Sequence, residues 1–444
     1  MNGIPKHGRI WRRVAWTLSS AALVTVAISC ENTLKVTNPQ NLDSAVLDNP
    51  LILQAVVDGV EGTLQQAFGN YVIFAGLMSD ELEDSSTWIN YANMSLGRFG
   101  PSFLNDQNTQ NTLLQMRYAA GDAEARITRV LGAAGATSTI MAQAQTSDAW
   151  TDLYNAMMYC ESPLVSNGPS VPDSAVYKQA LSKFNTAITT AQGAPAGAPT
   201  TAILNWARTG RARTNLFLGN WDAATADAAA VPAGYVKLAL FSTNSATSGA
   251  GNQLNQAHNK SGTLRRIWWP MVDTSNVSIT PTPDQYITDP WTGQNDPRMA
   301  VLHTKGNKGV SNQILYYSIE KYKDYQASIT MTGKAEMNLI QAEVYWRKGD
   351  LPNAVASLNI DRQAAGLPAF AMPLKSADVF NRLLSERFAQ MFVEGMRMTD
   401  LNRFNLVTQQ LGTGRALKFQ MSYSEIIGNP SLTLGKQTCP AMSQ

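Results

Sequence analysis

Four acidic residues lie within five positions in the stretch GLMSDELEDSS, namely Asp80, Glu81, Glu83 and Asp84. Two carboxyl groups on either side of a glycosidic bond act as the acid and base of a glycosidase. Several carboxylate oxygens held together can instead bind Ca²⁺. A run of this kind is more typical of a solvated loop or of the polar rim of a ligand site, and we adopt that interpretation while keeping Ca²⁺ as an alternative. The sequence therefore predicts no catalytic residue here.

Aromatic residues in irregular parts of the chain are the candidates for ligand recognition. A flat ring packs against the C–H side of a sugar, while amide and carboxylate groups bond its hydroxyls. The candidate ligand-binding residues are Trp88, Asn90, Tyr91, Trp268, Trp269, Tyr286 and Trp291, with Tyr316 and Tyr317 as further aromatics of the same kind. Trp88 and Trp291 come first because polar residues accompany them. Trp221 and Trp346 fall in helical segments, so we expect both to pack inside the fold.

Known catalytic and metal-binding signatures are missing from the sequence. It contains no G-x-S-x-G, H-E-x-x-H or P-loop pattern. Apart from His7 near the N-terminus, only His258 and His303 are present, and neither has a close His or Cys companion. We therefore predict no zinc site, no cofactor and no enzymatic activity.

Cys30 is one of three cysteines and directly follows an apolar run near the N-terminus. The run, from about Val14 to Ile28, is shorter than the ~20 residues of a transmembrane helix and suits a secretory signal peptide. The sequence Ala27-Ile28-Ser29 before the cysteine resembles the lipobox of bacterial lipoproteins. We expect residues 1–29 to be removed and Cys30 to be acylated as a membrane anchor. An ordinary signal peptide with a coincidental cysteine is the alternative.

The composition of the remaining chain excludes some partners. Removal of residues 1–29 takes away four of the 35 basic residues and none of the 33 acidic ones, so the formal charge falls from +2 to −2. A near-neutral chain has no basic surface for nucleic acid, and no later stretch is apolar enough to span a bilayer. Cys160 and Cys439 could form a disulfide in an oxidising compartment, although the sequence gives no distance between them.

Two mostly helical blocks, about residues 30–230 and 333–410, flank an irregular segment of about residues 231–332. In YKQALSKFNTAITTA and VFNRLLSERFAQMFVEG, apolar residues recur at the spacing of one helix face. The segment between the blocks is rich in Asn, Ser, Thr, Gly and Pro, with room for short strands, for instance around residues 314–319. So much irregular chain inside a compact protein tends to carry function.

An internal repeat connects the two helical blocks. RTGRARTNLFLGNWDAATAD aligns with NLIQAEVYWRKGDLPNAVAS, and the matched pairs are Ala212 with Ala342, Gly219 with Gly349, Asn220 with Asp350, Trp221 with Leu351, and Ala224 with Ala354. The pattern is a helix, a tight turn and a second helix, and it resembles the tetratricopeptide hairpin, whose repeat is ~34 residues. Such hairpins bury their apolar faces by stacking on one another. In the second copy, Asp350 is predicted to cap the helix that follows it.

The stretch EMNLIQAEVYWRKGDLPNAVASLNIDRQAAGLPAF, followed by LLSERFAQMFVEGMRMTDLNRF, resembles the C-terminal signature of the SusD/RagB nutrient-uptake lipoproteins. The matching positions are Ala342-Glu343, Gly349-Asp350, Leu358-Asn359, Arg362, Ala365-Gly366-Leu367, Glu386-Arg387, Glu394-Gly395, Arg397, Asp400-Leu401 and Arg403-Phe404. GLMSDELEDSS and LFLGNWDAATADAAAVPAGYV resemble the family as well, so the likeness extends over nearly the whole mature chain. The chain departs from the pattern where DRQAAG replaces the usual Val-Arg-x-x-Ala-Gly run.

The resemblance implies an all-α fold of tetratricopeptide-like hairpins, carrying a long irregular loop segment with minor β structure. It implies one SusD-like domain over residues 30–444 after a lipoprotein signal peptide at residues 1–29. Members of this family are anchored on the outer membrane facing outside, partner a TonB-dependent SusC-like transporter, and bind a glycan or peptide for import. The charged residues of the motif, from Glu386 to Arg403, are expected to form ion pairs between packed helices rather than to catalyse.

Two other functions stay open at this point. A tetratricopeptide lipoprotein that assembles envelope proteins, with no nutrient ligand, would expose a concave helical groove without the long loop segment. A surface glycosidase would need the acidic run at Asp80–Asp84 to face a cleft.

Overall fold

The computed structural model describes residues 46–82, 84, 89–98, 104–242, 252, 286–302, 318–319, 321–322, 326–416 and 418–437, with only the backbone described at 104–108, 286–287, 301–302 and 318. The chain divides into two units, Met1–Asn49 and Pro50–Gln444. The described part of the first unit contains a short 3-10 helix, η1 (Val46–Asp48). The predicted signal peptide and the Cys30 anchor therefore lie outside the described residues.

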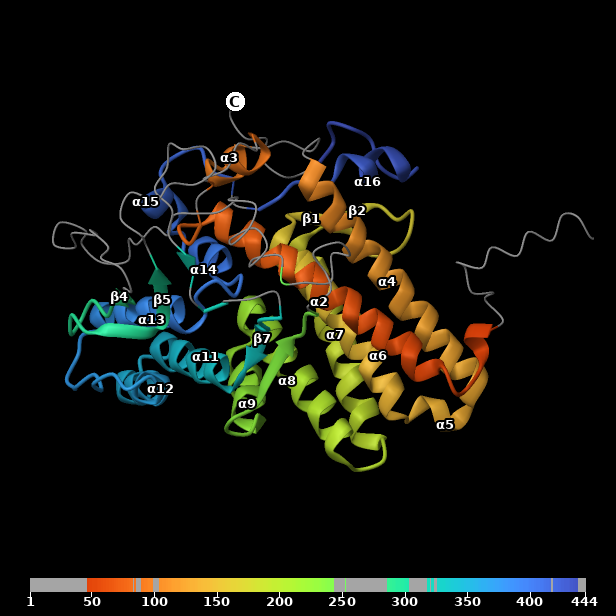
Figure 1. Cartoon of the computed structure of the whole chain (residues 1–444), viewed down its shortest axis with the longest axis horizontal. Coiled ribbons are helices and arrows are strands. Elements are labelled where there is room, and N and C mark those ends of the chain that lie inside the picture. Colours follow the sequence, from red (N-terminus) through yellow and green to blue (C-terminus); the bar gives the residue numbers. More distant parts are fainter. Residues whose placement is uncertain are drawn as a thin grey trace, which may run out of the picture. The chain divides into compact units, whose positions relative to one another are not determined.

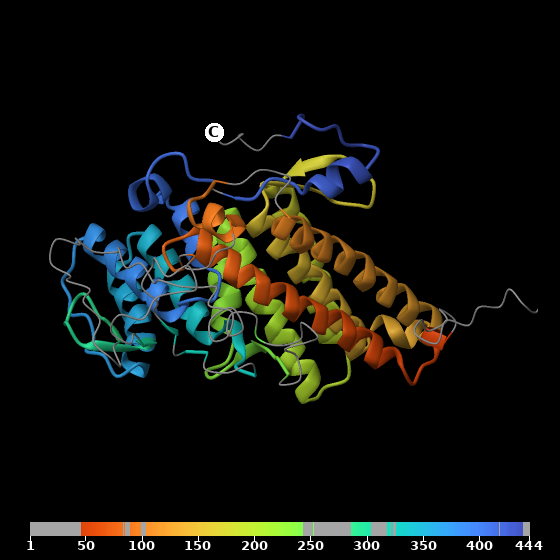
Figure 2. The ribbon, with the colours of Figure 1, turned by 45° about the horizontal axis from the view of Figure 1, so that its top comes forward.

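Helices dominate the second unit, which confirms the predicted fold class (Figure 1). Its first half contains α2 (Leu53–Met78), α3 (Ile89–Ser95), α4 (Leu104–Leu131), α5 (Ala133–Ala136), α6 (Thr139–Met158), α7 (Asp173–Gly193), α8 (Ala198–Leu218) and α9 (Trp221–Ala230). Helix α6 packs against α2, α4, α7 and α8, so it is the central helix of this half. Figure 2 shows α2 and α4 lying side by side along one face.

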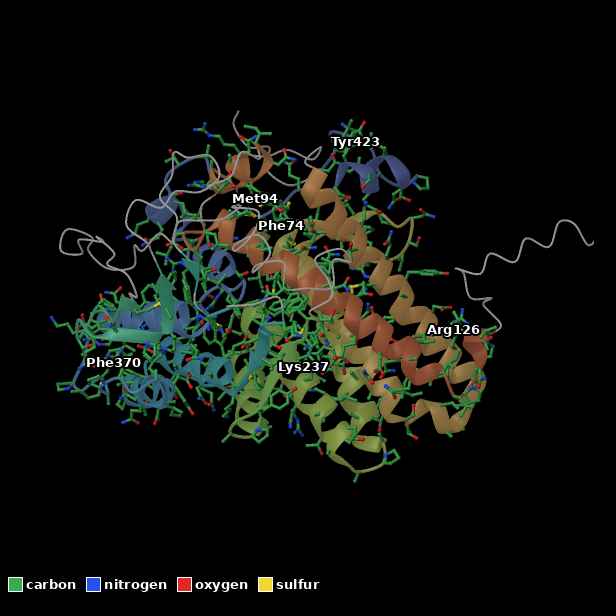
Figure 3. All side chains as sticks on the ribbon, viewed as in Figure 1. Phe74, Met94, Arg126, Lys237, Phe370 and Tyr423 are labelled. Atoms are coloured by element: carbon green, nitrogen blue, oxygen red, sulfur yellow. The ribbon has the colours of Figure 1, made fainter. Side chains whose placement is uncertain are left out.

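The second half continues the same packing after the irregular segment. It contains α11 (Lys334–Arg347), α12 (Leu351–Ala364), α13 (Ser376–Gln390), α14 (Arg397–Arg403), α15 (Val407–Leu411) and α16 (Tyr423–Gly428). Helix α11 packs against α9 on one side and against α12 and α13 on the other, so it joins the two helical blocks. Helix α14 returns to α2, and α16 lies on α4. Figure 3 marks Tyr423 on α16 and Phe370 at the other end of this half.

The repeat predicted from the sequence is a pair of matching hairpins, α8–α9 and α11–α12. Gly219 and Gly349 end the first helix of each hairpin with φ of 78° and 79°, in the left-handed region that favours glycine. The paired alanines lie at the helix contacts and are fully buried, at Ala212 and Ala342 and again at Ala224 and Ala354. The oxygen of the Asp350 side chain accepts a hydrogen bond from the Asn353 amide at 3.3 Å, which confirms the predicted cap.

Short antiparallel strands accompany the helices, as the sequence predicted for the irregular segment. Strands β3 (Val236–Ala239) and β7 (Ile329–Gly333) pair with Val236 opposite Gly333. Strands β4 (Tyr286–Thr288), β5 (Asn295–Leu302) and β6 (Ser318–Ile319) form a three-stranded sheet with Tyr286 opposite Ala300. A separate hairpin of β1 (Glu161–Pro163) and β2 (Ser170–Pro172) links α6 to α7.

Large aromatic residues fill the core where α6, α7 and α8 meet. The rings of Trp150 and Trp206 stack at 6.4 Å, and Phe184 meets Trp150 edge to face at 5.8 Å. These rings lie so close to α8 that a Cβ at Gly210 would be 2.2 Å from the Phe184 ring. Within the described part of the chain, no helix combines the length and the apolar character needed to cross a membrane.

Candidate functional site

The predicted recognition residues come from two segments, and several lie outside the described residues. The residues outside the described part of the chain are Trp88, Trp268, Trp269, Tyr316 and Tyr317. Tyr286 is described only by its backbone, in β4. Asn90 and Tyr91 lie on α3, whereas Trp291 lies in the turn between β4 and β5. The structure therefore gives side-chain surroundings for Asn90, Tyr91 and Trp291.

Tyr91 is half-buried and packs onto α2. Its ring meets Phe74 edge to face, with centroids 6.4 Å apart. Both Tyr91 and its neighbour Asn90 are partly accessible on α3. Tyr91 therefore contributes packing through one part of its ring and leaves another part within reach of a ligand.

Trp291 is held in the β4–β5 turn by its surroundings. The ring meets Phe370 edge to face at 6.2 Å, and the Arg382 guanidinium lies 4.2 Å from its centroid. Its Nε1 atom is buried without a hydrogen-bond partner among the described residues. Since one face of the ring is occupied by Arg382, a ligand can reach only the remaining part of this half-buried side chain.

The turn that carries Trp291 is shaped by Asp289. The Asp289 amide donates to the Gln294 carbonyl at 2.7 Å, and Gly293 follows with a φ of 70°. Asp289 Oδ2 also accepts hydrogen bonds from the amide and the hydroxyl of Thr292, at 2.9 and 2.6 Å. The chain therefore closes tightly around the Asp289 carboxylate and projects Trp291 from a fixed turn.

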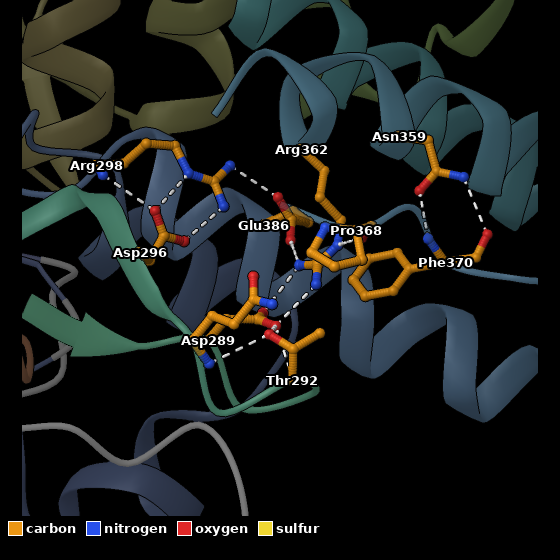
Figure 4. Close-up of polar contacts among 10 residues, drawn as sticks. Asp289, Thr292, Asp296, Arg298, Asn359, Arg362, Pro368, Phe370 and Glu386 are labelled. Atoms are coloured by element: carbon orange, nitrogen blue, oxygen red, sulfur yellow. Dashed lines mark hydrogen bonds and ion pairs between the residues drawn. The ribbon is translucent and has the colours of Figure 1, made fainter. Parts of the chain in front are cut away.

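A buried ion-pair network connects this turn to two helices (Figure 4). Arg362 of α12 donates to both oxygens of Asp289, at 2.8 and 2.7 Å, and to Glu386 of α13 at 2.8 Å. The other Glu386 oxygen accepts from Arg298 of β5 at 2.7 Å, and Arg298 also pairs with Asp296. Two-point pairing of a guanidinium with a carboxylate fixes direction as well as distance. The network therefore locks β4–β5 onto α12 and α13.

Burial and pairing act in opposite directions on Asp289. Burial alone would raise the pKa of its carboxyl group, but the hydrogen bonds from Arg362 and Thr292 outweigh this, and the pKa lies below its usual value. Arg362 is itself fully buried and lies 4.0 Å from the Phe370 ring centroid. The turn is therefore held by a carboxylate that stays charged at neutral pH.

The acidic run near the N-terminus is buried rather than solvated, so our leading interpretation of it is wrong. Arg397 of α14 donates to both oxygens of Asp80, at 2.6 and 2.5 Å. Glu81 is fully buried and accepts a hydrogen bond from the Val393 amide at 2.9 Å. Asp84 is also buried, and Glu83 lies outside the described residues. The partners that bury the run are more than 300 residues away, which the local sequence does not reveal.

The buried run offers little to a substrate or a metal ion. Burial raises the pKa of Glu81 to about 8, so this carboxyl group is largely protonated at neutral pH. Asp80 is engaged with Arg397, and neither carboxyl group opens onto a cleft as a glycosidase pair must. Throughout the described ranges, no group of three or more His, Cys, Asp or Glu side chains is arranged to hold a metal ion.

The charged residues of the C-terminal motif form ion pairs between packed elements, as predicted. Arg387 of α13 donates to both oxygens of Asp400 of α14, at 2.8 and 2.9 Å. Arg403 pairs with Asp400 at 2.9 Å and also contacts Glu343 of α11. The remaining motif residue in this set, Glu394, pairs with Lys321 at 2.8 Å. These residues hold the structure together.

Three further expectations have different outcomes. Trp346 stacks on Phe380 with centroids 4.6 Å apart, which confirms its packing role. Trp221 is 36% exposed at the start of α9, so the prediction that it packs inside the fold is wrong. Cys160 takes part in a disulfide. Cys439 lies outside the described residues, so the pairing of the two cysteines stays a prediction.

A groove of about 760 Å³ lies beside α4 and was not predicted from the sequence. Its walls come from α4, the β1–β2 loop, α7 and α16. One signal in the sequence could have pointed to it. The buried residues of α4 include Leu113, Met116, Ala120 and Ile127, and Tyr118 falls off this face and is 75% exposed. A large aromatic on the polar face of an amphipathic helix is therefore the feature to look for.

Residues 287–427 match the SusD family model, and solved SusD-like proteins have a similar fold. A SusD superfamily protein from Bacteroides vulgatus ATCC 8482 is 16% identical over 85% of this chain and 98% of that chain, with a TM-score of 0.61. A SusD-like protein from Bacteroides fragilis NCTC 9343 is 13% identical over 89% and 98%, with a TM-score of 0.63. A laminarin-binding SusD-like protein is 15% identical over 88% and 99%, with a TM-score of 0.61. No curated protein matches the chain.

These comparisons confirm the resemblance seen in the sequence and show where it is carried. The sequence match lies in residues 287–427, which contain β5 and the helices α11 to α15 with their ion pairs. Over the rest of the chain, the similarity to these proteins is in the fold alone.

Proposed function

Because the chain has the SusD-like fold and the SusD family sequence over residues 287–427, we propose that it captures oligosaccharides at the bacterial cell surface. In this proposal the protein is a lipoprotein, anchored to the outer membrane through acylated Cys30 and facing outside. It hands its ligand to a TonB-dependent, SusC-like transporter. It binds the ligand without cleaving it and uses no cofactor.

The observation that carries the proposal is the similarity of fold along almost the whole chain, together with the family match at its C-terminal part. One of the similar structures is a laminarin-binding protein. This favours a glycan over a peptide as the class of ligand. Trp88, Trp268, Trp269 and Trp291 remain the candidate platform residues, and Asn90, Tyr91 and Tyr286 their candidate neighbours.

Two structural features weaken the alternative functions. A glycosidase at the acidic run would need carboxyl groups facing a cleft, whereas Asp80 and Glu81 are buried in contacts with Arg397 and Val393. An assembly lipoprotein built of hairpins alone would lack the β4–β5–β6 sheet, which this chain locks onto α12 and α13 through Arg362.

Anchoring and partnership are tested together in the native membrane. Wild-type protein should be labelled by a fatty-acid probe, remain with the outer membrane and copurify with a large β-barrel transporter after gentle solubilisation. Cys30→Ser should lose the label and appear in soluble fractions while keeping the wild-type melting temperature, because it changes no residue of the helical unit. Unlabelled wild-type protein, or a lone protein under conditions that preserve such complexes, would contradict the proposal.

A further inference from the structure

The groove beside α4 has walls that are fixed by hydrogen bonds. Arg117 donates to the Pro163 carbonyl at 2.6 Å, and Gln179 of α7 donates to the Leu164 carbonyl at 3.3 Å. From the other side, the Asn429 side chain donates to the Gly168 carbonyl at 3.0 Å, and the Ser431 hydroxyl donates to the Asn167 carbonyl at 2.7 Å. The β1–β2 loop is therefore pinned between α4, α7 and the chain after α16. Both Figure 1 and Figure 2 show this hairpin beside α16.

An aromatic side chain and an open surface lie together on the α4 wall. Tyr118 is 75% exposed and lines the groove. Gly121 comes three residues later on the same helix, and a Cβ there would meet no atom within 4 Å. Residues three or four apart on a helix are neighbours on its surface. The ring of Tyr118 therefore stands next to unoccupied space, where a flat ligand has room to stack.

Three of the four charged side chains of the groove are paired with opposite charges within the protein. Arg117 pairs with Asp152 at 2.5 Å, and Lys183 pairs with Asp148 and Asp152 at 2.8 and 2.7 Å. Of the acidic residues, Asp122 pairs with Arg126 at 2.6 Å. The fourth charged residue of the wall, Glu425, accepts a hydrogen bond from Asn429 at 2.9 Å. When these partners are counted, three of the four charges cancel and only that of Glu425 remains, so the groove is close to neutral.

The most exposed side chains of the groove are uncharged. The β1–β2 loop exposes Val165, Ser166 and Asn167, and α4 exposes Gln115 beside Tyr118. Amides and hydroxyls can both donate and accept hydrogen bonds, so they suit a ligand rich in hydroxyl groups. The apolar partners Leu164 and Val165 and the Tyr118 ring suit the C–H faces of such a ligand.

We propose that this groove is a binding site for an uncharged oligosaccharide, separate from the aromatic residues near α3 and the β4–β5 turn. The volume of about 760 Å³ falls in the range of ligand-binding clefts. The near-neutral wall gives no cluster of charge for an anionic or cationic ligand, and the pinned loop provides a site that is organised before binding. The inference rests on the proposed capture of oligosaccharides and names a place on the chain where it occurs.

The test is calorimetric titration of the mature chain with laminarin-derived oligosaccharides, then with other uncharged glucan, xylan and mannan oligosaccharides. Tyr118→Ala removes the ring, and Gly121→Leu fills the space beside it. We expect each to weaken binding about tenfold or more. Both positions are exposed, so the melting temperature should stay at the wild-type value, with a slight rise for Gly121→Leu because leucine favours the helix. Trp221→Ala, at an exposed aromatic on α9, which packs on α8 and α11 and contributes no residue to the groove, is the matched control and should bind normally.

The ligand class is tested by salt and by charge. Binding of an uncharged glycan should change little when the salt concentration rises to about 0.5 M, because no exposed charge pair is formed. Preference for sulfated or uronate oligosaccharides, with affinity that falls steeply with salt, would overturn the assignment of an uncharged ligand.

The outcomes separate this inference from the proposed function. If the wild type binds a glycan and both variants bind equally well, the groove is not the site while oligosaccharide capture stands. If the wild type binds none of the panel, both fall. Weakening by Tyr118→Ala and Gly121→Leu, with Trp221→Ala unaffected, supports the groove.

Discussion

Ion pairs have different roles around the β4–β5 turn and in the groove beside α4. In the first region Arg362 is fully buried and joins Asp289 to Glu386, so it holds together segments that are far apart in the sequence. In the groove, Arg117 and Lys183 are paired with Asp152 at the wall, and the neighbouring Tyr118 is left exposed. Ion pairs in the first region hold the fold together. Ion pairs in the second cancel most of the charge of a groove whose most exposed side chains are uncharged. The charged residues of the family motif therefore stabilise the fold.

The largest effect is expected where a buried charge loses its partner. Arg362→Met leaves Asp289 and Glu386 buried without their shared cation. We expect the free energy of unfolding to fall by about 3–5 kcal/mol, measured by urea denaturation. Arg382→Met is the matched control, because Arg382 also lies over the Phe370 ring but has no ion pair among the described residues. Equal losses for the two variants would show that packing, rather than the network, holds the turn.

A slightly smaller effect is expected at Gly395, which combines a left-handed backbone conformation with a close approach to a neighbouring side chain. Its φ is 80°, and an added Cβ would lie 2.4 Å from the Tyr71 ring, whose hydroxyl donates to the Gly395 carbonyl at 2.6 Å. Gly395→Ala should destabilise the protein by about 3 kcal/mol, from ~1–2 kcal/mol of left-handed strain and the rest from overpacking.

Gly349→Ala separates the two contributions to the Gly395 effect. Gly349 has a φ of 79° and open space around its Cβ position. This variant should lose only the strain part, about 1–2 kcal/mol. Thermal or urea unfolding that gives the same loss at both glycines would contradict the contact with Tyr71.

A substitution at Trp291 tests whether this aromatic residue stabilises the fold or binds the ligand. Because its half-buried ring contacts Phe370 and Arg382, Trp291→Ala should lower the free energy of unfolding by about 2 kcal/mol, below the 3–5 kcal/mol of a fully buried tryptophan. The exposed Trp221, changed to Ala, should lose less than about 1 kcal/mol. An unchanged melting temperature together with lost glycan retention would instead make Trp291 a ligand platform.

A pH dependence of the stability, spread over several pH units, belongs to Glu81. Burial raises the pKa of its carboxyl group from 4.5 in the unfolded chain to about 8 in the folded one. The folded state therefore binds the proton more tightly, and the stability from this residue is fully present below pH 4.5 and is lost as the pH rises towards 8. Each pH unit in that window removes up to about 1.4 kcal/mol. Urea titrations of Glu81→Gln across the window should lack this slope, and identical slopes in the variant and wild type would contradict the assignment.

The helical frame could be predicted from the sequence because its signals are local. Gly219 and Gly349 end helices, and Ala212 and Ala342 repeat at a helix contact, each read from a few neighbouring residues. The acidic run was misjudged because Asp80 meets Arg397 across 317 positions. The groove was missed for the same reason, since α4, the β1–β2 loop and α16 meet only in the folded chain.

The central claim is that this protein captures glycans, and retention in native gels containing polysaccharide tests it most directly. The mature chain should migrate more slowly in at least one gel with an uncharged polysaccharide such as laminarin than in a gel without it. Free reducing ends should not accumulate, because we propose binding without cleavage. Unchanged migration across a broad panel of uncharged and charged polysaccharides, or release of sugar fragments by the purified protein, would contradict the account.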